Sequence, residues 1–275
     1  MFNPTLTEIP HQNQSEVEPT GILNALMSLL AKEKRIPFIS RVFPALNQRL
    51  SKSRRYRIVI YSHDTMGIEY TRQNVQIAQI LANSSLQVDV LIISGIWEAS
   101  TLPLPPNVDF LTLPAIDQTS DGCFQARSLN ISLLDITELR SEIIQVAIVG
   151  FDPDLLIVDK APLGAIGELS ATLKYLKTQE HSHCALWLHD ALEEPTTLEQ
   201  IWEFPAHENA IREYYDAIWI HGDCVDHSNI HSYYWAHEVT AKTRYIGNLD
   251  QPSWSIDASV NSLDTLSKQV PMSAL

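Results

Sequence analysis

The sequence predicts an α/β fold built on a doubly wound, mostly parallel sheet. Short, continuously apolar runs alternate along the chain with longer segments in which apolar residues recur at helical spacing. Strands covered by helices on both faces of a parallel sheet have this unbroken apolar character, because neither side of such a strand meets water. Regular alternation of such strands with helices is typical of a doubly wound sheet.

The first strand is expected at the β-branched run Ile58–Tyr61, and a helix is expected at Tyr70–Asn83 after the loop Ser62–Gly67. Further strands are expected at Val88–Gly95, Pro106–Pro114, Asp154–Lys160, Cys184–Asp190, Ala217–Asp223 and Thr243–Asp250. The remaining helices are expected at Ser132–Val149, Gly167–Thr178 and Thr197–Tyr215. Residues 115–130 are expected to form a polar loop.

Charge and composition divide the chain into four segments. Residues 1–20 are rich in Pro, Gln, Asn and Glu and are expected to be a disordered tail, and residues 251–275 a polar tail. Residues 21–56 are expected to be a basic amphipathic helical arm, and residues 57–250 the folded domain. Residues 1–57 contain nine Lys/Arg and four Asp/Glu, whereas residues 58–275 contain ten Lys/Arg and twenty-nine Asp/Glu.

The basic arm predicts attachment to an anionic membrane surface through residues 21–57. Apolar residues at helical spacing, followed by a run of cations, are typical of a helix that lies on a bilayer. The alternative is that Leu23, Leu26 and Leu30 pack onto the domain while the arginines stay solvated.

Other function classes are disfavoured by composition. The acidic body argues against nucleic-acid binding. The three cysteines are widely spaced, which fits free thiols in the cytoplasm, and no metal or cofactor is expected. No stretch has the roughly 18 apolar residues of a spanning helix, and the polar, acidic start does not read as a secretory signal. A cytoplasmic protein, peripheral on the membrane if the arm binds there, is therefore expected.

Polar residues follow five of the expected strands, and the carboxyl ends of parallel strands share one edge of the sheet. These clusters are His63-Asp64, Ser94-Gly95, Asp159-Lys160, His189-Asp190 and His221-Gly222-Asp223. Ligands of doubly wound sheets bind beyond that edge. The sequence therefore predicts a polar cleft there.

The loop after the first strand holds the candidate catalytic residues. His63 or Asp64 could act as the general base that activates an acceptor hydroxyl. Ser62, Thr65 and Gly67 are expected to contact the substrate from the same loop. The alternative is a polar loop in which Asp64 or Thr65 caps the next helix. On that helix, Arg72 and Asn74 are expected to reach a phosphate, unless they only form its solvated face.

The other strand ends supply the remaining expected substrate contacts: Asp159, Lys160, Gly164, His189, Asp190, Glu194, His221 and Asp223. A cation directly after a buried strand often meets an anionic group, although Lys160 can also pair simply with Asp159. Glu168 is expected to cap its helix, and helix capping is likewise the alternative for the residues near Pro195. His189, Asp190, His221 and Asp223 are residue types that bind metals, but nothing in their spacing requires a metal site, and none is expected.

Several blocks of the sequence resemble one enzyme family. YSHDTMGIEYTRQN, LIISG, LPLPPNVDFLTLPA, RSLNISL, LLIVDKAPLGAIGEL, HDALEEP and YYDAIWIHGD resemble, in order, the N-terminal half of predicted bacterial glycosyltransferases. These are relatives of the enzyme that adds N-acetylglucosamine to the lipid-linked peptidoglycan precursor. The resemblance runs from about Arg57 to Asp250 and implies one Rossmann-like half of a two-domain fold. That half usually holds the acceptor, and the other half binds the sugar nucleotide.

Two departures limit what the resemblance implies. Glu69 and Tyr70 stand where the family's opening loop has a Gly-His pair, and a carboxylate there would repel a phosphate. The sequence also ends where the family crosses into its donor-binding half. The expected function is thus the acceptor side of a hexosyl or N-acetylhexosaminyl transferase that is inactive without a separate donor-binding subunit. The alternative is a degenerate, non-catalytic protein that binds a glycan or a partner.

Overall fold

A computed structural model of the chain describes residues 20–30, 55–62, 68–84, 86–188, 205–221, 239 and 241–246. Within these residues the centre of the fold is a seven-stranded sheet in the order β3-β2-β1-β6-β7-β8-β9, with all neighbours parallel. Its strands are β1 (Tyr56–Tyr61), β2 (Val88–Ser94), β3 (Val108–Thr112), β6 (Leu155–Asp159), β7 (His183–Leu188), β8 (Ala217–Ile220) and β9 (Thr243–Tyr245). The predicted α/β, doubly wound, Rossmann-like fold is confirmed.

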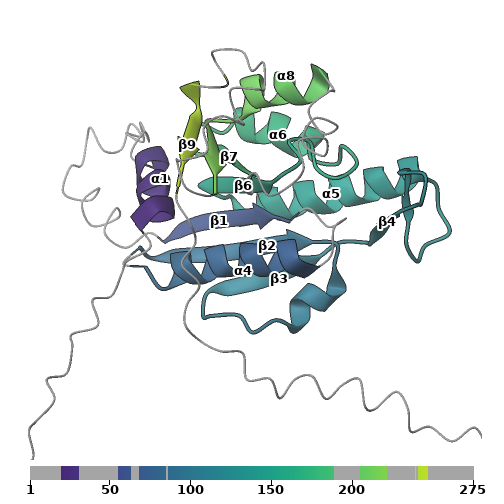
Figure 1. The fold of residues 1–275 in the computed structure, drawn as a ribbon, viewed down its shortest axis with the longest axis horizontal. Coiled ribbons are helices and arrows are strands. Elements are labelled where there is room, and N and C mark those ends of the chain that lie inside the picture. The colour runs from purple at the N-terminus through teal and green to yellow at the C-terminus, as the bar shows by residue number, and fades with distance from the viewer. Residues whose placement is uncertain are drawn as a thin grey trace, which may run out of the picture.

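Helices cover both faces of the sheet (Figure 1). Alternate residues of β1 point to opposite faces, so Ile58 and Ile60 enter one apolar core and Val59 and Tyr61 the other. On the first face lie α1 (Thr20–Leu30) and α4 (Ile68–Ala82). The second face is covered by α5 (Leu133–Phe151), α6 (Ser170–Lys177) and α8 (Pro205–Tyr214). This double coverage is the reason for the continuously apolar strands in the sequence.

The expected polar loop at 115–130 is wrong. The chain forms a small antiparallel hairpin there, from β4 (Ile116–Gln118) and β5 (Phe124–Ala126). A hydrogen bond from the Thr119 N–H to the Cys123 carbonyl, 2.8 Å long, closes its turn. Each strand has three residues and only Ile116 is buried, so the segment carries no alternation long enough to predict a strand.

The ends of several elements also differ from expectation. The strands expected at Asp154–Lys160 and Cys184–Asp190 end at Asp159 and Leu188, and the 3-10 helix η1 (Trp97–Thr101) was not predicted. The helix expected at Thr197–Tyr215 is described only as α8, because residues 197–204 lie outside the described part of the chain. By contrast, α5 begins next to its expected start, because Ser132 and Asp135 form a reciprocal capping box.

Helix α1 packs onto the domain. Ile22, Leu26 and Leu29 are 2%, 0% and 3% exposed and belong to the same core as Ile58 and Ile60. The apolar side of the arm is therefore used in the fold, as in the docking alternative. Arg55, the arm's last cation, binds the domain, and Arg57 in β1 binds the end of α5. Arg55 Nε lies 2.8 Å from Asp89 Oδ1, and Arg57 donates to the Phe151 carbonyl at 3.0 Å.

The basic residues between α1 and Arg55 lie outside the described residues, so attachment to an anionic membrane stays a prediction. None of the helices in the described segments combines the length and the apolarity needed to span a bilayer.

Gly21 of α1 lies against the backbone of Ile246, the residue after β9, and replacing it tests the docking of the helix. A Cβ at this position would lie 1.8 Å from the Ile246 carbonyl oxygen, which is a fixed backbone atom. We expect Gly21→Ala to lower the free energy of unfolding by about 1–3 kcal/mol, because the helix must move away and lose packing. The measurement is the urea midpoint of the full chain.

The matched control is Gly150→Ala in α5. A Cβ there would meet no atom within 4 Å, so alanine should leave stability unchanged or raise it by about 0.5–1 kcal/mol. A Gly21→Ala protein with the wild-type midpoint would contradict the packing of α1 against Ile246.

Candidate functional site

The strand order places a topological switch point between β1 and β6. From β1 the chain continues outward through β2 and β3 in one direction, and from β6 through β7, β8 and β9 in the other. The connections that leave the carboxyl ends of β1 and β6 therefore diverge. In open α/β sheets the crevice at such a point is where ligands bind.

A buried polar cluster lies at this switch point, formed by Ser62, Thr71, Asn74 and Asp159. The Asn74 amide nitrogen is 2.9 Å from both the Ser62 hydroxyl and Asp159 Oδ2. It therefore links Ser62, which follows β1, to Asp159, the last residue of β6. Ser62 and Thr71 Oγ atoms are 3.3 Å apart. All four side chains are 0% exposed. The expected contacts Ser62, Asn74 and Asp159 are thus brought together by the fold.

Lys160 lies beside this cluster and is 3% exposed. Its backbone is left-handed, with φ of 61°, and its N–H donates to the Trp187 carbonyl at 2.8 Å. Burial lowers the pKa of the Lys160 ammonium, while the neighbouring Asp159 carboxylate acts in the opposite direction and raises it. A buried cation is thus held at the end of the central strand, next to a carboxylate.

The geometry of the cluster favours a role in shaping the site. Its side chains are closed to solvent and fix how the chain leaves β1 and β6. One acceptor is left over, because Asn74 Oδ1 is buried and has no hydrogen-bond partner in the described part of the chain. An unsatisfied buried acceptor is unusual, since most buried polar atoms are hydrogen-bonded.

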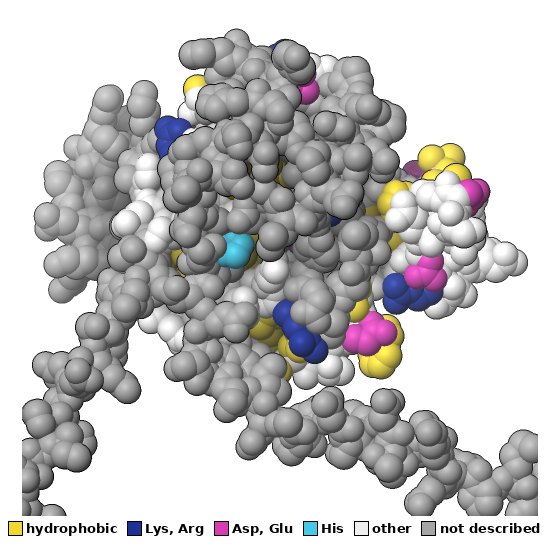
Figure 2. All heavy atoms as spheres, in the orientation of Figure 1, with side chains coloured by type: hydrophobic (Ala, Val, Ile, Leu, Met, Phe, Trp, Pro, Cys, Tyr) yellow, Lys and Arg dark blue, Asp and Glu magenta, His cyan; other side chains and the backbone are white. Residues whose placement is uncertain are grey.

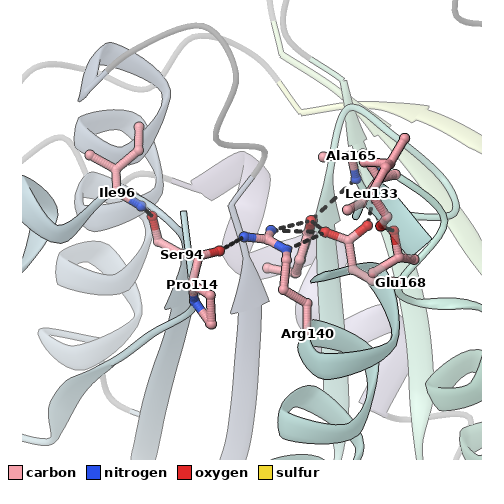
Figure 3. Close-up of polar contacts among 10 residues, drawn as sticks. Ser94, Ile96, Pro114, Leu133, Arg140, Ala165 and Glu168 are labelled. Carbon is pink, nitrogen blue, oxygen red and sulfur yellow. Dashed lines mark hydrogen bonds and ion pairs between the residues drawn. The ribbon is translucent and has the colours of Figure 1, made fainter. Parts of the chain in front are cut away.

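A second buried network centres on Arg140 of α5 and Glu168. Arg140 Nη2 and Nε lie 2.8 and 3.1 Å from Glu168 Oε1, with both side chains 0% exposed. Figure 3 shows the guanidinium directed to Glu168 on one side and to the Pro114 carbonyl, 2.7 Å away, on the other. Tyr61 of β1 adds a donor, because its hydroxyl is 2.6 Å from Glu168 Oε1. The network joins β1, α5, the segment after β3 and the loop after β6.

The loop after β6 takes its shape from this network. Lys160, Gly164 and Gly167 all have positive φ, of 61°, 84° and 90°. Glu168 Oε2 accepts from the Ile166 N–H at 2.8 Å, and a Cβ on Gly164 would approach that oxygen to 2.7 Å. Gly164 therefore allows the loop to fold over the Glu168 carboxylate. Glu168, expected to cap a helix, is instead the acceptor that organises the loop.

The other expected site residues fall into two groups. His221 is half-buried after β8 and stacks on Trp187, with ring centroids 6.0 Å apart, while Arg72 is exposed on α4. The expected catalytic pair His63 and Asp64 lies outside the described residues. The same holds for Thr65, Gly67, His189, Asp190, Glu194 and Asp223. Among the described side chains, no three His, Cys, Asp or Glu residues are grouped as a metal site would require.

Sequence reasoning missed Arg140 and Tyr61, although the sequence contains a signal for the first. Arg140 stands at four-residue spacing with Ile136, Ile144 and Ile148, and these four are the buried residues of α5. A charged residue on the apolar stripe of a helix needs a buried partner. The acidic partner, Glu168, follows Gly167 directly and is the only Asp or Glu in residues 160–179.

Comparison with known proteins does not assign this chain to a family. No family model and no curated protein matches the sequence. A UGT transferase from Siraitia grosvenorii, solved in complex with UDP, is 14% identical with a TM-score of 0.46 over 79% of this chain and 57% of that one. A UDP-N-acetylglucosamine 2-epimerase is 9% identical with a TM-score of 0.44 over 71% and 49%.

An FtsZ mutant from M. jannaschii is 13% identical, with a TM-score of 0.37 over 66% of this chain and 50% of that one. The chain thus spans about half the length of each of these three proteins. At these identities and TM-scores the likeness is one of general fold and carries no argument about activity.

Proposed function

We propose that this chain is the acceptor-side domain of a glycosyltransferase that works with a separate donor-binding subunit. The observation that carries the proposal is the buried polar cluster of Ser62, Thr71, Asn74 and Asp159, with Lys160 beside it, at the switch point between β1 and β6. A ligand site is expected there in this fold class. The sequence blocks around these residues supply the chemistry, because they resemble the acceptor half of bacterial glycosyltransferases.

The same cluster supports a second candidate, a non-catalytic glycan-binding protein. Asp159 is buried and hydrogen-bonded by Asn74, so it is not presented to a substrate hydroxyl as a general base. Glu69 and Tyr70 replace the family's Gly-His pair. Both candidates require an acceptor to bind at the switch point, and they differ in whether transfer follows once a donor-binding subunit is added.

The proposal is tested by calorimetric titration of the full chain with two ligand classes. A polyprenyl diphosphate-linked sugar in detergent micelles is expected to bind, and a panel of UDP-sugars is not expected to bind at micromolar concentrations. Arg72→Ala is expected to weaken acceptor binding about tenfold or more, since a hydrogen bond from a cation to phosphate contributes about 1.5–3 kcal/mol. Arg72 is exposed, so the variant should fold.

Arg212→Ala is the matched control. Arg212 is also exposed, but it pairs with Glu208 on α8 at 2.6 Å, away from the switch point, and its replacement should leave affinity unchanged. Micromolar binding of any UDP-sugar would contradict the assignment to the acceptor side. Equal acceptor affinity of wild type and Arg72→Ala would remove Arg72 from the site, and absence of acceptor binding by the wild-type chain would overturn both candidates.

A further inference from the structure

Helix α5 and the segment before it expose an unusual number of apolar side chains. Leu134 and Val146 are 76% and 74% exposed. Together with the other exposed apolar residues nearby, they form a set that we call the α5 surface: Leu129, Ile131, Leu133, Leu134, Leu139, Val146 and Val149. Five of the seven lie within residues 129–139. Single exposed apolar residues are normal, whereas several close together in the chain favour an interaction site.

These side chains cannot be buried by a small rearrangement of the helix. The opposite side of α5 already packs through Ile136, Ile144 and Ile148, and the Arg140–Glu168 ion pair fixes its rotation. The start of the helix is fixed by the capping box of Ser132 and Asp135. The α5 surface is therefore an ordered, outward-facing part of the fold.

The α5 surface begins at the same edge of the sheet as the switch point between β1 and β6. Helix α5 runs back from the carboxyl edge of the sheet to the start of β6, so its first residues lie at the carboxyl edge. Four of the seven apolar residues fall within 129–134, at that end. Figure 2 shows hydrophobic side chains exposed at the end of the molecule where β4 and one end of α5 lie in Figure 1.

The charges around the surface decide what kind of partner fits. Asp135, Glu138 and Glu142 are exposed on α5, whereas the helix's only cation, Arg140, is buried and paired. The nearby Arg127 is paired with Asp117 at 2.6 Å. A second copy of this chain would oppose carboxylates to carboxylates, and an anionic bilayer would be repelled by them. A protein surface with apolar side chains bordered by Lys and Arg is complementary in both respects.

We propose that the α5 surface binds a separate protein through an apolar contact bordered by that partner's Lys and Arg residues. Its position at the carboxyl edge of the sheet places such a partner at the same edge as the switch point between β1 and β6. The inference rests on the proposed function in one respect, which is that the partner is the donor-binding subunit. Contact at this edge lets a bound donor face an acceptor held between β1 and β6.

The partner is identified by photo-crosslinking in the native cell. The full chain carries a benzophenone amino acid at position 134 in one sample and at position 174 in the other. Lys174 is exposed on α6 and serves as the control site. An adduct of one discrete mass is expected from position 134 and not from position 174. No adduct, the same adducts from both positions, or an adduct with a second copy of the chain would overturn the proposal.

Affinity then tests whether binding uses the surface as described. The partner identified in the adduct is purified by itself, without the crosslink. It is titrated with this chain as wild type, as Leu134→Glu, as the double variant Glu138→Lys/Glu142→Lys, and as the control Lys174→Glu. We expect Leu134→Glu to weaken binding by about 10–100-fold, as for the central residue of an interface. The double reversal is expected to weaken it about tenfold, mainly through slower association, and added salt should weaken the wild-type complex.

The outcomes separate this inference from the proposed function. Unchanged affinity of Leu134→Glu, or tighter binding of the double reversal, would show that the partner does not use the α5 surface. If the partner's binding depends on the α5 surface but the partner does not bind a UDP-sugar, the α5 surface remains an interaction site. The partner is then not the donor-binding subunit. Each substituted side chain is exposed, so the urea midpoint of each variant should match that of the wild type.

Discussion

Arg140→Met is expected to lower the free energy of unfolding by about 3–5 kcal/mol, measured by urea denaturation. The substitution keeps the length and the apolar stem of the side chain but leaves the Glu168 carboxylate buried without its cation, 2.8 Å from where Nη2 was. Glu168 also organises the loop after β6, so its carboxylate cannot move out to water without losing the hydrogen bond from the Ile166 N–H. The loss of the hydrogen bond to the Pro114 carbonyl adds to the cost.

A double-mutant cycle provides the control for this prediction. Arg140→Met combined with Glu168→Gln should cost clearly less than the sum of the two single substitutions, because the double variant has no unpaired charge. Additive losses would show that the two side chains act independently. A single variant as stable as the wild type would show that Glu168 finds another partner.

Ile157→Ala is expected to lower the free energy of unfolding by about 2–5 kcal/mol. Ile157 is 1% exposed in the middle of β6, where it is in register with Ile60 of β1 and Ala185 of β7. Removing its side-chain atoms leaves a cavity that the two neighbouring strands are too constrained to fill. The urea midpoint is again the measurement.

The control for Ile157→Ala is Val146→Ala. Val146 is 74% exposed on α5, so the same kind of truncation should change stability by less than about 0.5 kcal/mol. An unchanged midpoint for Ile157→Ala would contradict the position of β6 in the centre of the sheet.

The sheet could be predicted from the sequence because its strands are buried on both sides. Residues such as Ile58–Tyr61 form unbroken apolar runs for that reason, and the five residues of β6 are all buried. The hairpin β4–β5 could not be predicted, because its strands are three residues long and only Ile116 in them is buried. The sequence predicts the end of β6 at Lys160, one residue after its observed end at Asp159. A buried polar residue at this point is compatible with either the strand or the following loop.

The candidate site was predictable only in part. Polar residues at the ends of apolar strands indicated Ser62, Asp159 and Lys160, and the fold brings them together because the switch point lies between β1 and β6. That Asn74 links them depends on how α4 packs against the sheet, which the sequence does not state. The link between Arg140 and Glu168 joins residues 28 positions apart through tertiary packing, so periodicity alone could indicate one member but not its partner.

The contact of Gly21 with Ile246 has a consequence for how the chain acquires its fold during synthesis. Helix α1 is completed early, but the backbone it packs against is made roughly 200 residues later. At about 5–20 residues per second, that interval lasts roughly 10–40 s. During this time Ile22, Leu26 and Leu29 lack part of the surface that buries them in the folded domain. Helix α1 is thus synthesised before the other described elements and is among the last of them to reach its final packing.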